Sequence, residues 1–248
     1  MSTRSVWLKI LVPTLFIIGC QADERNSAPP AGDAANPPLT AGSPDAARGA
    51  SGDRKVVLFV GTSLTAALGL EPEQGFPARV QEKIDSAGLP FEVVNAGVSG
   101  ETSTGARARI GWLLNQPFDV LVLETGANDM LRGTRLDRLR GNIEAIVDTV
   151  RQVRPDARIV LTGMLASPNL GADYGRDFRA VYTEVARADS LPLVPFLLEG
   201  VAAVPELNLG DGIHPNERGH RVVADNVWKV LEPVLREEAA EQPARDAA

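Results

Sequence analysis

Two histidines occur in the whole chain of 248 residues, and one of them closes the tetrad Asp211-Gly212-Ile213-His214. An aspartate three residues before a histidine, across a glycine, can fold back and accept a hydrogen bond from the ring Nδ1. That bond leaves Nε2 free to take a proton, as a general base does. Hydrolysis through a serine would therefore need His214 or His220 as its base, and the tetrad favours His214.

Ser63 is the serine that the sequence places best for nucleophilic attack. It lies in the block Gly61-Thr62-Ser63-Leu64-Thr65 after the apolar run Val56–Val60, which predicts a turn at the end of a strand. A serine hydroxyl attacks well only when a base removes its proton as the bond forms. Thr65 stands where a Gly-x-Ser-x-Gly elbow would have glycine, and no Gly-Lys-Ser/Thr follows Gly61. An α/β-hydrolase elbow and a phosphate-binding loop are therefore both disfavoured.

Three positions could donate hydrogen bonds to the oxyanion of a tetrahedral intermediate. Ser63 offers its own N–H, Gly100 offers an N–H with no Cβ in the way, and Asn128 offers its side-chain amide. Two of them also have simpler explanations: Gly100 suits a turn with positive φ, and Asn128 suits a cap of the following segment. Both interpretations stay open from these residues alone.

The apolar pattern predicts five strands that alternate with helices. The strands are continuous apolar runs, typical of parallel sheets buried on both faces, at Val56–Val60, Phe91–Asn95, Val120–Glu124, Arg158–Thr162 and Leu193–Phe196. Apolar residues at helical spacing predict helices around 76–84, 139–150, 178–185 and 223–234, and a less distinct one at 104–114. This alternation predicts an α/β fold, a three-layer α/β/α sandwich around a five-stranded parallel sheet. Ligands bind such sheets beyond the carboxyl ends of the strands, where Ser63, Gly100 and Asn128 are expected.

Taken together, these residues resemble the GDSL/SGNH hydrolases, most closely the thioesterase I, lysophospholipase L1 and arylesterase branch. The resemblance covers about residues 55–235 and rests on four blocks in order: Gly61-Thr62-Ser63-Leu64-Thr65, Asn95–Ser103, Gly126-Ala127-Asn128-Asp129 and Asp211–Asn216. It implies a flavodoxin-like sheet, with Ser63 as nucleophile, His214 as base and Asp211 as its orienting carboxylate. It also implies an oxyanion hole made by the N–H groups of Ser63 and Gly100 and the side chain of Asn128.

The first block departs from the family at one position. The family usually has aspartate after the first glycine, where this chain has Thr62. A threonine hydroxyl replaces some of the hydrogen bonds that a carboxylate makes. The residue at 62 therefore bears on the rate and on the rigidity of the nucleophile turn. The third block has Ala127 where many relatives have glycine, which is a mild change.

Other polar and aromatic residues receive structural interpretations. We expect His220 to be structural or solvated, Glu124 to hydrogen-bond backbone near the site, and Asp129 to orient the loop of the third block. Trp112 and Trp228 are interpreted as core or helix-packing residues. Two histidines and one cysteine leave no plausible zinc cluster, so we expect no metal and no cofactor.

The beginning of the chain predicts export. Arg4 and Lys9 precede an apolar run, Ile10–Gly19, that is too short to span a bilayer. The run ends in Ile17-Ile18-Gly19-Cys20, which resembles a bacterial lipobox, where cleavage leaves a lipidated cysteine. An ordinary secretion signal with a chance cysteine is the alternative.

The domain organisation follows from these patterns and from composition. We expect a lipoprotein signal peptide over 1–19, lipidation at Cys20, a flexible linker over 20–54, an SGNH hydrolase domain over 55–236 and a disordered tail over 237–248. Gln21 after the cysteine favours the outer membrane, so the predicted location is the bacterial cell envelope, anchored by lipid and facing the periplasm.

The expected function is hydrolysis of acyl esters or thioesters through an acyl-serine intermediate, on a small-molecule or lipid substrate. An apolar acyl groove could be lined by residues that follow strands three and four, namely Met130, Leu131, Met164, Leu165, Leu170 and Tyr174. Two alternatives stay open: an esterase that removes acetyl groups from carbohydrates, and a non-catalytic lipoprotein that binds acyl ligands. The formal net charge of -7 argues against a nucleic-acid partner.

Overall fold

The computed structural model describes residues 54–246, and the predicted signal peptide, lipidation site and nearly all of the linker lie outside them. Five parallel strands form one sheet in the order β2-β1-β3-β4-β5. Their bounds are β1 Lys55–Gly61, β2 Phe91–Gly97, β3 Val120–Glu124, β4 Arg158–Thr162 and β5 Leu193–Val194. The predicted α/β sandwich with a five-stranded parallel sheet is confirmed.

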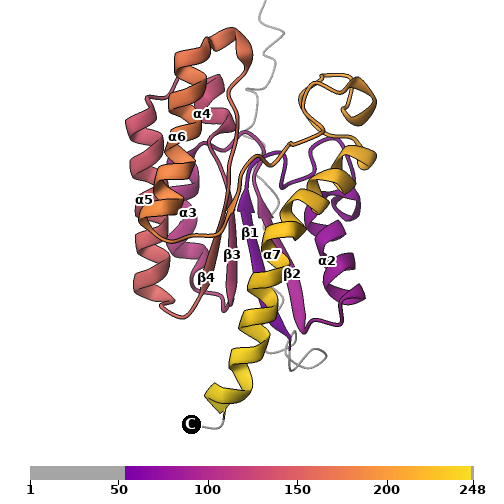
Figure 1. Cartoon of the computed structure of the whole chain (residues 1–248), viewed down its shortest axis with the longest axis vertical. Coiled ribbons are helices and arrows are strands. Elements are labelled where there is room, and N and C mark those ends of the chain that lie inside the picture. The colour runs from indigo at the N-terminus through magenta and orange to yellow at the C-terminus, as the bar shows by residue number, and fades with distance from the viewer. Residues whose placement is uncertain (1–53, 247–248) are drawn as a thin grey trace, which may run out of the picture. The chain divides into compact units, whose positions relative to one another are not determined.

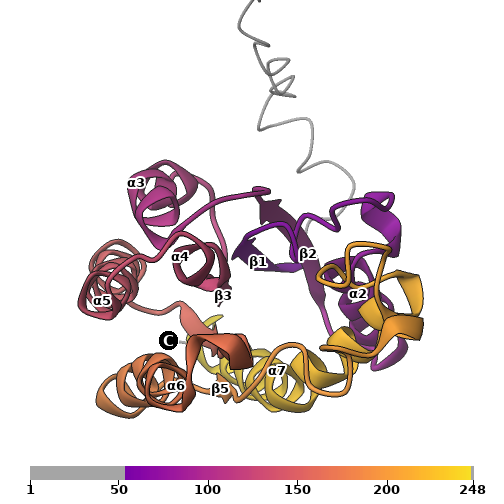
Figure 2. The same ribbon diagram turned by 90° about the horizontal axis from the view of Figure 1, so that it is seen from above.

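Helices cover both faces of the sheet (Figures 1 and 2). On one face α2 (Phe76–Ser86) packs against α7 (Glu217–Asp246), and on the other α5 (Leu136–Val153) packs between α3 (Ser103–Leu113) and α6 (Ala172–Ala188). Shorter helical segments lie in the connections, at α4 Ala127–Leu131, η1 Pro72–Gln74, η2 Pro168–Leu170 and η3 Pro205–Leu207.

The core forms where the apolar patterns of strands and helices meet. Every residue of β3 is buried, as the central strand of a sheet covered on both faces should be. The predicted helical stripes face this sheet: Phe76, Val80 and Ile84 of α2 and Leu139, Ile143 and Ile146 of α5 are fully buried. Beyond residue 53, no helix of the structure is long and apolar enough to cross a membrane.

Three sequence expectations differ from the structure. The last strand ends at Val194 rather than Phe196, because Pro195 has no N–H for a ladder hydrogen bond. Trp112 is expected to be a core or helix-packing residue, and the core role is wrong, since the residue is 59% exposed. It precedes Leu113, which lies on the buried stripe of α3, and neighbouring helical residues point about 100° apart.

The predicted disordered tail is the third difference. Helix α7 continues through Asp246 rather than ending near residue 236. Glu238 is 1% exposed, and its carboxylate and backbone carbonyl both accept hydrogen bonds from Lys55 at the start of β1. This buried ion pair fixes the helix on the sheet, so the folded domain extends past the predicted boundary.

The carboxyl ends of the strands are where the topology leaves room for a site. From β1 the chain moves first to one side, to β2, and then crosses to the other side, to β3. The connections that leave β1 and β3 therefore diverge, and such a switch point is the usual binding crevice of an open parallel sheet. Ser63 follows β1 and Asn128 follows β3 at this point.

Candidate active site

The structure brings together the three residues that the sequence singled out as nucleophile, base and orienting carboxylate. His214 Nε2 lies 2.9 Å from Ser63 Oγ, and His214 Nδ1 lies 2.6 Å from Asp211 Oδ2. Both distances are within hydrogen-bond range. Ser63 and His214 lie 151 positions apart in the chain, so only the fold brings them into contact.

Asp211 is fixed by the backbone of its own loop. Its Oδ1 accepts hydrogen bonds from the N–H groups of Ile213 at 2.9 Å and His214 at 3.0 Å, which leaves Oδ2 for the imidazole. These bonds, led by the one from the His214 backbone, hold the pKa of the Asp211 carboxyl well below its ordinary value. Asp211 is therefore an anion that orients His214 through its Nδ1.

The loop that carries His214 is held where α7 begins. Leu209 N–H donates to the His214 carbonyl at 2.7 Å, and Asn208 and Pro215 pair in an isolated antiparallel β-bridge. Gly212, between Asp211 and His214, has a φ of 69°, a left-handed conformation that glycine adopts without steric cost. The tight turn of the tetrad depends on this glycine.

The nucleophile turn sits above a buried carboxylate from the neighbouring strand. Glu124, the last residue of β3, accepts hydrogen bonds from the Thr62 N–H at 2.6 Å and the Thr62 hydroxyl at 2.9 Å. The Thr65 hydroxyl donates to the same carboxylate at 3.0 Å. The expectation that Glu124 binds backbone near the site is confirmed. The two hydroxyl contacts were not predicted, and the only sequence signal for them was the pair of threonines around Ser63.

The loop after β2 is tied to the nucleophile turn. Val98 N–H donates to the Gly61 carbonyl at 2.8 Å, and the side-chain amide of Asn95 donates to the Thr65 carbonyl at 2.8 Å. Gly100, further along this loop, has a φ of 77°. This is the positive-φ turn conformation expected of a glycine with a structural role. Nothing in that conformation conflicts with donation of its N–H to a substrate.

The loop after β3 is tied in turn to the loop that carries Gly100. Asn128, in the first turn of α4, donates its side-chain amide to the Glu101 carbonyl at 2.9 Å, which leaves its second amide hydrogen for another acceptor. Asp129 beside it is buried and accepts from the N–H of Ser103 at 2.7 Å and from the Ser103 hydroxyl at 2.7 Å. The predicted oxyanion donors thus lie on three loops that hydrogen bonds connect.

His220, the other histidine, is part of the core rather than of the site. It is 1% exposed, and its Nδ1 accepts a hydrogen bond from the Phe76 N–H at 3.1 Å. Burial lowers its pKa to about 4, so the ring is neutral near pH 7. This agrees with the structural role expected for it.

The residues proposed for an acyl groove divide into two groups. Met164 is buried, and Met130 and Tyr174 are half-buried against the core. Leu131, Leu165 and Leu170 are exposed large apolar side chains on the connections that leave β3 and β4. The backbone N–H of Ser167 contacts the Met130 sulfur at 3.4 Å, so these two connections touch. The exposed leucines are therefore available to a ligand at the carboxyl edge.

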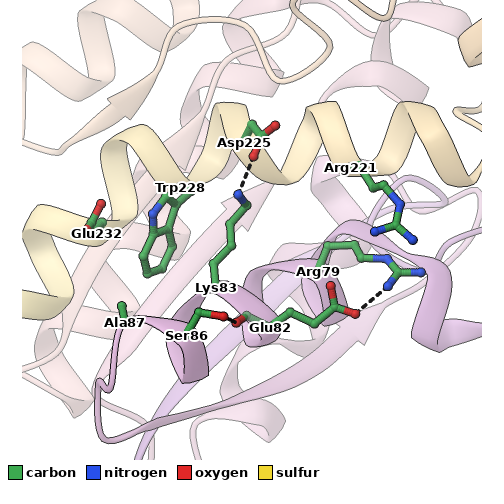
Figure 3. A pocket seen from close by; sticks show the side chains of 9 residues that line it. All are labelled: Arg79, Glu82, Lys83, Ser86, Ala87, Arg221, Asp225, Trp228 and Glu232. Carbon is green, nitrogen blue, oxygen red and sulfur yellow. Dashed lines mark hydrogen bonds and ion pairs between the residues drawn. The ribbon is translucent and has the colours of Figure 1, made fainter.

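A pocket of about 520 Å³ lies elsewhere, between α2 and α7 (Figure 3). Its wall includes Trp228, and each charged side chain of the wall has an ion-pair partner: Arg79 pairs with Glu82, Lys83 with Asp225, Arg221 with Glu217 and Glu232 with Arg236. None of the triad residues lines it. The pocket offers no uncompensated charge to a substrate and takes no part in the site.

The comparison with known proteins decides the family. The model of the GDSL-like lipase/acylhydrolase family matches residues 59–222. This chain belongs to that family. Esterase TesA of Pseudomonas aeruginosa is 39% identical over 182 residues, which cover 73% of this chain and 90% of the relative. Thioesterase 1/protease 1/lysophospholipase L1 of Escherichia coli K12 is 34% identical over 185 residues, 74% of this chain and 86% of the relative.

Solved structures agree with the family and with the fold. A crystal structure of TesA superposes with a TM-score of 0.69 at 38% identity, over 72% of this chain and 99% of that one. Psychrotrophic esterase EstA from Pseudoalteromonas sp., in a form inhibited by monoethylphosphonate, gives 0.68 at 30% identity, over 73% and 99%. The GDSL family member is thus an enzyme that hydrolyses acyl esters or thioesters, on the SGNH hydrolase fold.

Proposed function

We propose that this hydrolase works through an acyl enzyme on Ser63, with His214 as general base and Asp211 as the carboxylate that orients it. The observation that carries the proposal is the continuous chain of contacts from Ser63 Oγ to His214 Nε2 and from His214 Nδ1 to Asp211 Oδ2. Nucleophile, base and orienting group within hydrogen-bond reach are the geometric signature of serine hydrolysis.

The proposed reaction has two half-reactions. Ser63 Oγ attacks the carbonyl carbon of the ester while His214 Nε2 takes the hydroxyl proton, and the carbonyl oxygen becomes an oxyanion. The N–H groups of Ser63 and Gly100 and the free amide hydrogen of Asn128 then stabilise that oxyanion. The imidazolium gives its proton to the leaving alcohol or thiol as the tetrahedral intermediate collapses. Water repeats the sequence on the acyl-serine and releases the carboxylic acid.

The proposed substrates are esters or thioesters of apolar acyl chains. Leu131, Leu165 and Leu170 are exposed at the edge of the sheet that carries Ser63, where they would contact an acyl chain and remove its surface from water. The names of the relatives, thioesterase, lysophospholipase and arylesterase, are consistent with such substrates. Rates of hydrolysis on a panel of acyl esters, an acyl thioester, a lysophospholipid and an acetylated sugar would rank these substrate classes. The acetylated sugar would test the alternative of a carbohydrate esterase.

The decisive experiment compares wild type with Ser63→Ala on a short p-nitrophenyl ester. We expect a burst of p-nitrophenol from wild type and none from the variant, together with loss of labelling by a fluorophosphonate probe. Ser86→Ala is the control, because the Ser86 hydroxyl only binds the Glu82 carbonyl of its own helix. Hydrolysis by Ser63→Ala at the wild-type rate would disprove the role of Ser63.

We also propose that the enzyme is anchored by lipid at Cys20 and faces the periplasm from the outer membrane. The support is the sequence alone: the basic start, the short apolar run, the lipobox-like ending and Gln21. The test is the membrane fraction and lipid labelling of Cys20→Ala. An equally membrane-bound and equally labelled variant would contradict the anchor.

A further inference from the structure

The mechanism above gives no role to the carboxyl of Glu124, although it lies directly beneath the nucleophile turn. Glu124 is 1% exposed, and its two oxygens receive every one of its hydrogen bonds from Thr62 and Thr65, the residues around the serine. Within residues 54–246 no lysine, arginine or histidine forms an ion pair with it. A buried carboxyl held only by hydroxyl and amide donors is uncommon and costs solvation free energy.

The sequence around Ser63 is complementary to this carboxyl. A Cβ on Gly61 would lie 2.7 Å from Glu124 Oε2 and would collide with the Thr65 hydroxyl, so only glycine leaves room for the contact. Thr62 and Thr65 supply the two hydroxyl donors, and both side chains are buried. Three residues of the block Gly61-Thr62-Ser63-Leu64-Thr65 are thus explained by Glu124 rather than by the substrate.

The contacts reach the reacting groups through one peptide. The N–H and hydroxyl of Thr62 bind Glu124, while the Thr62 carbonyl accepts the Ala66 N–H at 2.9 Å. Thr62 is therefore held by its N–H, its hydroxyl and its carbonyl, and this carbonyl belongs to the peptide that carries the Ser63 N–H, which the mechanism assigns to the oxyanion. The orientation of this peptide also sets the direction in which Ser63 Oγ points toward His214.

The charge state of Glu124 matters because its surroundings are dry. Burial raises its pKa, and the hydrogen bonds from Thr62 and Thr65 oppose that shift. The facing titratable group is the Tyr182 hydroxyl of α6, which donates to the Thr125 carbonyl. Burial, with Glu124, Asp129 and Tyr174 adding to it, raises the Tyr182 pKa well above its ordinary value, so it stays protonated. Three donors reach this carboxyl, namely the Thr62 N–H and the hydroxyls of Thr62 and Thr65.

We propose that Glu124 is a positioning residue for the hydrolysis, whose buried carboxyl fixes the Ser63 N–H and Oγ by way of Thr62 and Thr65. The inference rests on Ser63 being the nucleophile. It gives the hydroxyl at position 62 a role, because this hydroxyl lies within hydrogen-bond distance of the Glu124 carboxyl.

The first test removes one hydroxyl and keeps the shape of the side chain. Thr62→Val should lower kcat on a short p-nitrophenyl ester by about 10- to 100-fold, the scale expected for a misplaced reacting group, with KM nearly unchanged. Thr62→Ser, which restores the hydroxyl, should return kcat close to wild type. Thr162→Val is the matched control. Thr162 lies on β4, next to the strand that carries Glu124, and is as buried as Thr62, but its hydroxyl donates to the Leu123 carbonyl at 3.2 Å.

The second test uses charge. In Thr62→Asp the two carboxyls must share one proton, so kcat should fall on the alkaline side of the profile as that proton is lost. In Thr62→Asp/Glu124→Gln only one carboxyl remains, and the alkaline fall should disappear. Wild type should show no such fall over the same range.

Three results would overturn the proposal. One is equal kcat for Thr62→Val and Thr162→Val, and another is an identical pH profile for the single and double variants. The third is a Thr62→Val variant that loses both kcat and thermal stability, together with a Thr62→Ser variant that does not regain kcat. If Thr62→Asp does not fold, the valine and serine variants still decide. Failure of the nucleophile assignment would differ, because Ser63→Ala would then retain hydrolysis and fluorophosphonate labelling.

Discussion

At the scale of single residues, one carboxylate fixes both its own loop and the catalytic base. Asp211 uses Oδ1 for two backbone N–H groups and Oδ2 for His214 Nδ1. The two oxygens are therefore not interchangeable. Any side chain at 211 that keeps the loop must present an acceptor to the backbone, and only a carboxylate has a second acceptor left for the ring.

This division of labour predicts the effect of Asp211→Asn. The two backbone donors will bind the amide oxygen, so the amide NH₂ must face His214 Nδ1. The ring then carries its proton on Nε2 and cannot take the proton of Ser63. We expect kcat to fall by roughly 10⁴-fold, as for the same change in the serine protease triad, with little effect on folding.

The control is Asp137→Asn, on the surface of α5. Asp137 has a pKa lowered to about 2 by its hydrogen bonds with Arg135, but it has no contact with the triad. Steady-state kinetics on a short ester should separate the two variants. Retention of more than a tenth of wild-type kcat by Asp211→Asn would contradict the proposed tautomer.

At the scale of elements, the second histidine joins two helices. His220 near the start of α7 accepts the N–H of Phe76 at the start of α2 and stacks on its ring, with centroids 6.2 Å apart. The acceptor must be a neutral Nδ1, so protonation of this ring breaks the contact. The packing of α2 against α7 is thus linked to pH.

The linkage can be measured as stability. Burial lowers the folded-state pKa of His220 to about 4, against an ordinary value of 6.5. The unfolded chain therefore binds the proton more tightly, and stability falls as pH drops below 6.5 until the folded ring protonates near 4. The full contribution is about 3 kcal/mol. Urea unfolding at pH 7 and pH 5 should show the decline in wild type and a smaller one in His220→Gln.

The same elements show what the sequence could predict. The central strands and the helical stripes were predictable because burial on one or both faces imposes a period on apolar residues. The triad was predictable because only two histidines exist and one follows an aspartate. The contact of Thr62 and Thr65 with Glu124 was not, because strand register decides which residue lies beneath a turn. The length of α7 was also missed, since its last turns are polar and one buried pair holds them.

At the scale of the whole domain, that buried pair joins the beginning of the sheet to the last helix. Lys55 Nζ donates to the Glu238 carbonyl at 2.9 Å and to its carboxylate at 2.5 Å, and Arg158 also contacts this carboxylate. Lys55 is 8% exposed. An ammonium group in such a place depends on its partners, because isolated charges are costly to bury.

Truncation tests this dependence. A chain that ends at Arg236 removes both partners of Lys55 and should lose about 3 kcal/mol or more of unfolding free energy. A chain that ends at Asp246 and is otherwise the same should match the full-length protein. The measurement is the urea midpoint of each, and equal midpoints would show that the last turns of α7 add nothing to the fold.

The contact between Lys55 and Glu238 also determines which ends of the domain can be used to immobilise the enzyme. Helix α7 runs back from the carboxyl edge of the sheet toward the opposite edge, where β1 begins (Figure 1). Both ends of the described chain therefore leave the domain far from Ser63. Attachment by either end would leave the entrance to the catalytic serine unobstructed. A short peptide could also join the two ends in a circular permutant opened at the exposed Gly88 turn.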